Sequence, residues 1–161
     1  MKEYNLEGFE RGLAELGIAL SEEQKTQFLQ YYALLVEWNS FMNLTAITEF
    51  DQVITKHFLD SLSLVKVCDV AQAGRILDVG TGAGFPGIPL KIAFPEVEVV
   101  LLDSLNKRVK FLNEVIGQLG LSKITAIHGR AEDFARQKEY REQFDLVVSR
   151  AVANLSSLSE Y

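Results

Sequence analysis

Residues 75–94 read RILDVGTGAGFPGIPLKIAF, which is an apolar segment, a glycine-rich turn and a second apolar segment. The range 75–79 predicts a strand, and the range 88–94, which Pro95 follows, predicts a helix. Between them, four glycines let the backbone turn sharply and let a ligand approach without a Cβ in the way. The stretch therefore predicts a strand, a ligand-binding loop and a helix, with an unliganded tight turn as the weaker alternative.

The same alternation continues toward the C-terminus. Residues 97–102 are rich in valine and leucine and predict a second strand, and the apolar spacing that follows predicts a helix ended by Gly120. Residues 123–128 and 144–149 predict two more strands, with a helix over 132–141 between them. Strands that alternate with helices build a parallel sheet, so the predicted fold class is α/β.

Helical patterns dominate the first part of the chain. Ser21 with Gln24 has the spacing of a capping box, and Thr48 with Asp51 repeats it. Apolar residues then recur at helical intervals after each pair. The character of the sequence changes near Gly74. We therefore expect a helical N-terminal region, residues 1–73, packed on a Rossmann-like cofactor-binding core, residues 74–161.

Length and composition narrow the class of protein. A chain of 161 residues, 48% hydrophobic and 24% charged, suits one soluble domain, and its start lacks a signal-peptide pattern, so we expect a cytoplasmic protein. The single cysteine, Cys68, excludes an intrachain disulfide and a cysteine-cluster metal site. A net charge of −6 argues against binding nucleic acid by overall charge. Lys107, Arg108 and Lys110 offer a local basic patch, with a solvated helix face as the commoner alternative.

Two nucleotide cofactors fit the loop. Residues 82–87 satisfy the G-x-G-x-x-G fingerprint of dinucleotide sites, and Asp103 ends the second strand, where a carboxylate binds ribose hydroxyls in either case. Asp78 favours S-adenosylmethionine, because a carboxylate there suits the ammonium of a methionine moiety and would repel a pyrophosphate. Asp103 has helix capping as its alternative role, although we expect Ser104 to be the cap.

Polar residues also follow the later strands and mark one helical segment. Residues 129–133 contain acidic side chains and backbone N–H groups that could bind an adenine edge, with a capped helix start as the alternative. Arg150 places a cation at the same sheet edge, where a salt bridge is an equally common role. His57, Asp60 and Ser61 lie at helical spacing, which predicts one polar face near the substrate or, equally, a packing cluster between helix and sheet.

Taken together, these motifs resemble those of the bacterial family of 16S rRNA 7-methylguanosine methyltransferases, the glucose-inhibited division protein B family. The resemblance is carried by residues 76–92, 102–112, 130–132 and 144–151, and upstream by 38–39, 43–45 and 57–62. It implies a Rossmann-like S-adenosylmethionine-dependent methyltransferase fold with a helical N-terminal extension. Such a fold needs further strands, so we expect this sequence to be truncated at its C-terminus.

The resemblance also implies roles for individual residues. Gly80 and Phe85 would line the cofactor pocket, Ala131 and Glu132 would face the adenine, and Arg150 would border cofactor and target. The expected cofactor site comprises Asp78, Gly80, Gly82, Phe85, Asp103, Ser104, Ala131, Glu132 and Arg150. The expected substrate site comprises Asn43, His57, Asp60, Ser61 and Arg150.

The implied reaction transfers a methyl group from S-adenosylmethionine to N7 of a guanosine in 16S rRNA. N7 already carries an in-plane lone pair, so we expect no general base, and we expect no metal. The expected partner is 16S ribosomal RNA, bound by a monomer without membrane association. The alternatives are an NAD-binding Rossmann oxidoreductase and a truncated cofactor-binding module without turnover.

Overall fold

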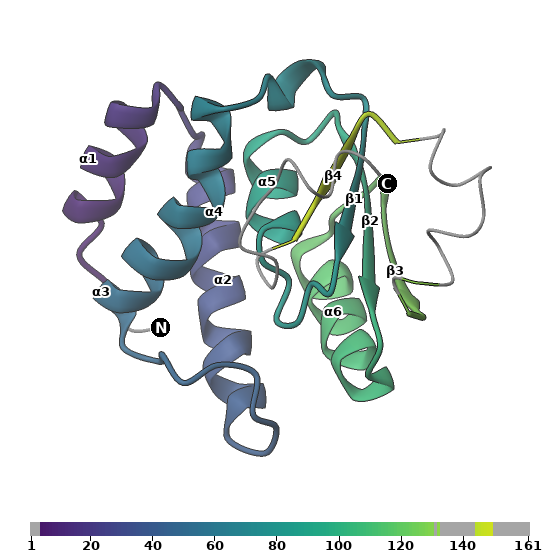
Figure 1. Ribbon diagram of the computed structural model, residues 1–161. Coiled ribbons are helices and arrows are strands. Elements are labelled where there is room, and N and C mark those ends of the chain that lie inside the picture. The colour runs from purple at the N-terminus through teal and green to yellow at the C-terminus, as the bar shows by residue number, and fades with distance from the viewer. Residues whose placement is uncertain (1–3, 131, 133–143, 150–161) are drawn as a thin grey trace.

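Four parallel strands form the centre of the protein. The computed structural model describes residues 4–130, 132 and 144–149. In that part the sheet has the order β3-β2-β1-β4, which confirms the α/β class (Figure 1). Each strand lies close to its predicted range; the strands are Arg75–Val79 (β1), Glu98–Asp103 (β2), Ile124–His128 (β3) and Leu146–Val148 (β4). The helix expected over 132–141 falls outside the described residues except for residue 132.

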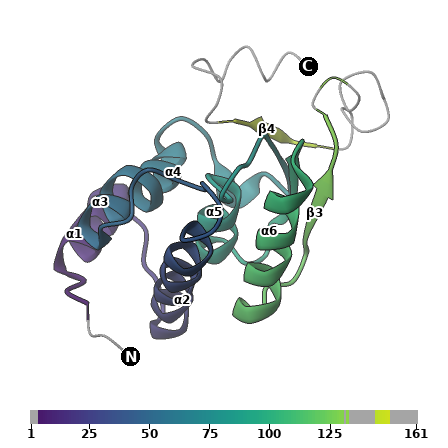
Figure 2. The same cartoon turned by 90° about the horizontal axis from the view of Figure 1, so that it is seen from below.

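Three helices cover one face of this sheet. Helices α5 (Gly87–Ala93) and α6 (Asn106–Leu119) connect successive parallel strands, and α2 (Glu22–Asn39) packs beside both (Figure 2). Helix α6 ends where expected, because Gly120 has the left-handed φ of 66° that glycine adopts without strain. Leu77, Val100 and Leu102 form a separate apolar cluster on β1 and β2. Strands joined by helical crossovers in this way give a Rossmann-like core.

The remaining helices pack largely on one another, and α4 among them packs on α5. They are α1 (Glu7–Leu16), α3 (Phe50–Val53), the π-helix η1 (Ile54–Leu59), α4 (Asp60–Leu62) and the 3-10 helices η2 (Ser63–Lys66) and η3 (Val70–Gln72). Among the described residues, no helix combines the length and apolar character that crossing a membrane requires.

One of the two predicted capping boxes exists. The Ser21 hydroxyl accepts the Gln24 amide hydrogen, and the Gln24 side chain accepts that of Ser21. The second prediction is wrong: Glu49 precedes α3 and makes no capping hydrogen bond through its side chain. The backbone carbonyl of Thr48 instead accepts a hydrogen bond from the Tyr32 hydroxyl at 2.6 Å. A tertiary contact therefore takes the place of the local cap.

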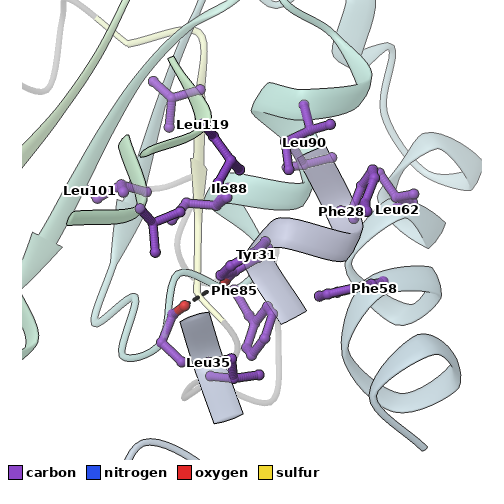
Figure 3. Packing of buried hydrophobic residues seen from close by; sticks show 14 of the residues in the cluster. Phe28, Tyr31, Leu35, Phe58, Leu62, Phe85, Ile88, Leu90, Leu101 and Leu119 are labelled. Atoms are coloured by element: carbon purple, nitrogen blue, oxygen red, sulfur yellow. Dashed lines mark hydrogen bonds between the residues drawn. The ribbon is translucent and has the colours of Figure 1, made fainter. Parts of the chain in front are cut away.

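Aromatic side chains join the helical layers to the sheet. Phe28 and Tyr31 of α2 lie against Phe58 of η1, and Phe85 of the glycine loop lies next to Tyr31 (Figure 3). The same apolar cluster continues to Val148 of β4. One core thus runs across the expected boundary at residue 73, and the division into two regions stays a prediction.

Candidate functional site

The glycine loop between β1 and α5 has the shape that the sequence predicted. Gly80, Gly82 and Gly84 all have positive φ, at 66°, 59° and 102°, which L side chains rarely adopt. Gly87 is required for a different reason, because a Cβ there would collide with Leu101 and with Asp78. This glycine lets the first turn of α5 pack directly on the sheet.

Asp78 binds two residues of this loop through its carboxylate. Its carboxyl group is completely buried, and its Oδ2 accepts hydrogen bonds from the Thr81 hydroxyl at 2.7 Å and the Gly87 amide at 2.8 Å. These bonds connect the end of β1 to the middle of the loop and to the start of α5. The expected contact between Asp78 and a methionine ammonium remains a prediction.

Asp103, the last residue of β2, also binds the glycine loop through its carboxylate. It is 1% exposed, and its two carboxylate oxygens accept the amide hydrogens of Gly82 at 2.8 Å and Leu105 at 2.9 Å. The Arg108 guanidinium lies 3.6 Å from Oδ1. Each carboxylate oxygen can accept a second hydrogen bond, so capacity for a ribose hydroxyl remains.

The expected cap at Ser104 is wrong. The residue that precedes α6 is Leu105, which makes no capping hydrogen bond through its side chain. Ser104 is exposed, and its backbone carbonyl lies 3.0 Å from Nε2 of His128 at the end of β3. Its place beside β3 leaves it available for a ligand.

A pocket of about 340 Å³ lies at the carboxyl ends of the strands. It is lined by Val79, Gly80, Leu102, Ser104, Gly129, Arg130 and Glu132. This lining contains three of the expected cofactor residues, Gly80, Ser104 and Glu132. Ligands of open α/β sheets bind at this edge. Two further expected residues, Ala131 and Arg150, lie outside the described part of the chain.

A second, larger cavity of about 540 Å³ lies elsewhere. It is lined by residues 16–19, 65–71, 93 and 94, so it lies where the chain enters β1 and leaves α5. Cys68 is on its wall, and burial raises the pKa of this thiol, which disfavours the reactive thiolate. The smaller pocket is the stronger candidate of the two, because Gly80 of the glycine loop lines it together with residues adjacent in sequence to the two buried aspartates.

The helical region brings His57 to the glycine loop. The His57 ring stacks on the Phe85 ring with 4.3 Å between centroids and 10° between planes. Its Nε2 lies 2.9 Å from the Thr45 hydroxyl. An expected substrate residue thus contacts an expected cofactor residue directly.

The other expected substrate residues differ in their exposure. Ser61 is buried and Asp60 is exposed, and the polar face shared with His57 stays a prediction. His57 lies in the π-helix Ile54–Leu59, whose turn is wider than that of an α-helix. Asn43 is exposed in the loop after α2.

Sequence reasoning missed two residues that shape the site. The Tyr31 hydroxyl donates to the backbone carbonyl of Ala83 within the glycine loop (Figure 3). Asn39, the last residue of α2, accepts the amide hydrogens of Leu44 and Thr45 on its Oδ1, at 2.8 and 2.9 Å. A buried tyrosine needs a partner for its hydroxyl, which was the one signal in the sequence that pointed to Tyr31.

The expected basic patch is only partly available. Lys107 and Lys110 are exposed on α6, whereas Arg108 lies near Asp103. The ion pair with the buried carboxylate gives Arg108 a structural partner at the glycine loop.

Comparison with known proteins identifies relatives along most of the chain. Residues 24–161 match the family model described as GidB, rRNA small subunit methyltransferase G. The Ribosomal RNA small subunit methyltransferase G of Lachnoclostridium phytofermentans is 62% identical over 152 residues, which cover 94% of this chain and 63% of that protein. The protein of the same name from Desulforamulus reducens is 57% identical over 147 residues, which cover 91% of this chain and 61% of that protein. This chain therefore spans about three fifths of the length of these relatives.

A solved structure supports the fold. A protein-L-isoaspartate O-methyltransferase from Plasmodium falciparum, in complex with S-adenosyl-L-homocysteine, matches with a TM-score of 0.58 and 19% identity. The match covers 98% of this chain and 78% of that one. The fold is therefore the Rossmann-like methyltransferase fold that the sequence predicted.

Proposed function

The chain belongs to the GidB family, rRNA small subunit methyltransferase G, and we propose that it forms the S-adenosylmethionine-binding core of an enzyme that methylates N7 of a guanosine in 16S ribosomal RNA. The observation that carries this proposal is the pocket at the carboxyl ends of β1, β2 and β3, which has Gly80 in its wall. A loop held by two buried carboxylates borders that pocket.

The residues of the pocket suit an adenosyl group. Val79 and Leu102 offer apolar contacts for a flat base, and Ser104 and Glu132 offer polar groups around it. Gly80 lets the cofactor approach the backbone, because nothing projects from its Cα. We propose that Asp103 accepts a ribose hydroxyl and that Phe85 closes the side toward the helical region.

Bound S-adenosylmethionine supplies a methyl group on a positively charged sulfur. The guanine N7 lone pair can attack that carbon without prior loss of a proton, so the chain's residues need to hold and align the two reactants. Alignment of this kind is worth about 7–11 kcal/mol in favourable systems. We propose that Asn43, His57, Asp60, Ser61 and Arg150 contribute on the RNA side, in a cytoplasmic monomer.

Two other functions deserve a direct test. An NAD-binding oxidoreductase would use the same glycine fingerprint, but the relatives named above favour the methyltransferase. A core that binds the cofactor without turnover is the other alternative, and a methyl-transfer assay separates it from an enzyme.

Calorimetric titration with S-adenosylmethionine, S-adenosylhomocysteine and NAD tests the cofactor. Saturable binding of both adenosyl ligands and no binding of NAD is the expected result, whereas binding of NAD alone contradicts the proposal. Transfer of a labelled methyl group to unmodified 16S rRNA then separates an enzyme from a binding module.

A pair of glycine variants localises the site. Gly80→Ala adds a methyl group at the pocket wall and should weaken binding of S-adenosylhomocysteine. Gly17→Ala is the matched control, because Gly17 has a similar φ of 72° but caps α1, with nothing within 4 Å of the added Cβ. Both variants carry the same backbone strain, so equal loss of affinity would contradict the placement of the cofactor.

A further inference from the structure

Among the contacts of the helical region with the glycine loop is one pair of stacked rings. His57 and Phe85 are both buried, at 9% and 6% exposure, and their nearly parallel rings are in contact. Phe85 lies just before the start of α5, inside the loop that Asp78 and Asp103 hold. A change in the position of the His57 ring therefore changes the space open to Phe85.

Thr45 fixes the direction of the His57 ring. Stacking restrains a ring mainly perpendicular to its plane, and a hydrogen bond to a ring nitrogen adds a restraint within that plane. The Thr45 hydroxyl supplies it, 2.9 Å from Nε2. The same oxygen accepts the Ile47 amide hydrogen at 3.1 Å, which fixes the hydroxyl in turn.

Asn39 fixes Thr45. Its side-chain oxygen accepts two consecutive backbone amides, those of Leu44 and Thr45, and so shapes the loop directly after α2. Asn39 is itself the last residue of α2. A continuous series of contacts thus runs from the end of α2 through Thr45 and His57 to Phe85.

We infer that Thr45 is a positioning residue for the cofactor site: it holds the His57 ring against Phe85 and so sets the wall that Phe85 forms. This inference rests on the proposed function, because it takes Phe85 to border the cofactor. Coupling between two sites is reciprocal, so a ligand on the glycine loop must also change the surroundings of Thr45. The loop after α2 and the cofactor site then respond to each other.

Two substitutions of Thr45 separate its hydroxyl from its shape. Thr45→Val removes the hydroxyl at constant size and should weaken binding of S-adenosylhomocysteine about fivefold, the effect of one typical hydrogen bond. Thr45→Ser keeps the hydroxyl and should bind within about twofold of the wild type. Thr55→Val is the matched control, because the Thr55 hydroxyl donates to the Asp51 carbonyl on an exposed helical surface.

The imidazole nitrogens provide a readout that a general loss of packing does not produce. The chain has two histidines, so ¹⁵N spectra of the rings can be assigned by comparison with a His128→Gln variant. Thr45→Val should shift the His57 signals and leave those of His128 in place, and Thr45→Ser should restore them. Unchanged affinity in folded Thr45→Val overturns the inference, whether or not the His57 signals move.

A measurement on the wild type keeps the test independent of folding. Addition of S-adenosylhomocysteine should shift the His57 ring signals and the Thr45 amide but not the Thr55 amide. If the ligand binds and the Thr45 and His57 signals stay in place, the inference is wrong while the proposed cofactor stands. If the wild type binds no adenosyl ligand, the proposed function fails first.

Discussion

Asp78 lies next to the last residue of β1 and Asp103 is the last residue of β2, and each carboxylate accepts a hydrogen bond from the backbone of the glycine loop. The sequence identified both carboxylates, but as ligand contacts. Their bonds to the loop could not be predicted, because the approach of Asp103 to Gly82 depends on how β1 and β2 pair. A carboxylate at the end of a strand can therefore hold the glycine loop in shape and also bind a ligand placed on that loop.

Substitution of Asp103 should therefore affect stability as well as binding. Asp103→Asn removes the charge that two backbone amides share and should lower the free energy of unfolding by about 1–3 kcal/mol. Urea denaturation measures this loss, and titration with S-adenosylhomocysteine measures the loss of affinity. Asp69→Asn, at an exposed position without a capping hydrogen bond, is the control. Full stability of Asp103→Asn would show that the loop does not depend on the carboxylate.

Lys91 makes a different prediction, on pH dependence. It is 1% exposed, and its Nζ donates to the carbonyls of Pro95 and Val97. Burial, with a smaller contribution from Lys123, lowers the pKa of Lys91 below the ordinary value of 10.5. Between the lowered pKa of the folded protein and the ordinary pKa of the unfolded chain, the unfolded chain binds more protons than the folded protein. The free energy of unfolding therefore rises with pH in that range.

Comparison with Lys91→Met isolates this effect. The difference in unfolding free energy, wild type minus variant, should increase as the pH rises toward 10.5. Chemical denaturation at a series of alkaline pH values measures it. A difference that falls with pH would mean that the folded protein stabilises the charged ammonium.

Among the elements, strands were easier to predict than the helical segment that carries His57. Buried strands of a parallel sheet are apolar throughout, so their runs stand out in the sequence. The segment from Phe50 to Leu62 instead changes from α-helix to π-helix and back. Helical spacing assumes one constant turn, so the expected alignment of Asp60 with His57 stays a prediction. No local residue pattern marks the wider turn.

Gly87 tests how closely α5 must approach the sheet. Gly87→Ala should destabilise the protein by about 1–3 kcal/mol, because the new Cβ meets Leu101 and the buried Asp78 carboxyl group. Gly117→Ala is the opposite case, since Gly117 lies inside α6 with nothing within 4 Å of an added Cβ. That variant should gain about 0.5–1 kcal/mol from reduced backbone freedom. Thermal unfolding of both variants measures the contrast; equal effects would contradict close packing at Gly87.

For the whole molecule, the sequence predicted the fold class and the sheet, and its division of the chain at residue 73 into a helical region packed on a core stays a prediction. The structure has one apolar cluster that contains Phe9, Phe58 and Val148. A change in residue pattern shows where helices give way to strands, but it does not show whether the two parts share a core. That property depends on side chains such as Phe58 and Phe85, which meet only after folding.

A shared core predicts one cooperative transition. Trp38, the only tryptophan, reports the helical region by its fluorescence, and amide exchange of Leu77 reports the sheet. Both should give the same unfolding midpoint in urea, as expected for a single two-state domain. Two separate midpoints would show that residues 1–73 unfold independently.

The strand order β3-β2-β1-β4 also has a consequence for synthesis on the ribosome. The chain leaves the ribosome from its N-terminus, so β1, β2 and β3 emerge before β4. Until residues 146–148 appear, β1 has one unpaired edge, where Leu77 later pairs with Val147. Exposed strand edges can join other chains. A nascent chain that pauses before residue 146 should therefore aggregate more readily than one that pauses after it, even though the aromatic core is already complete.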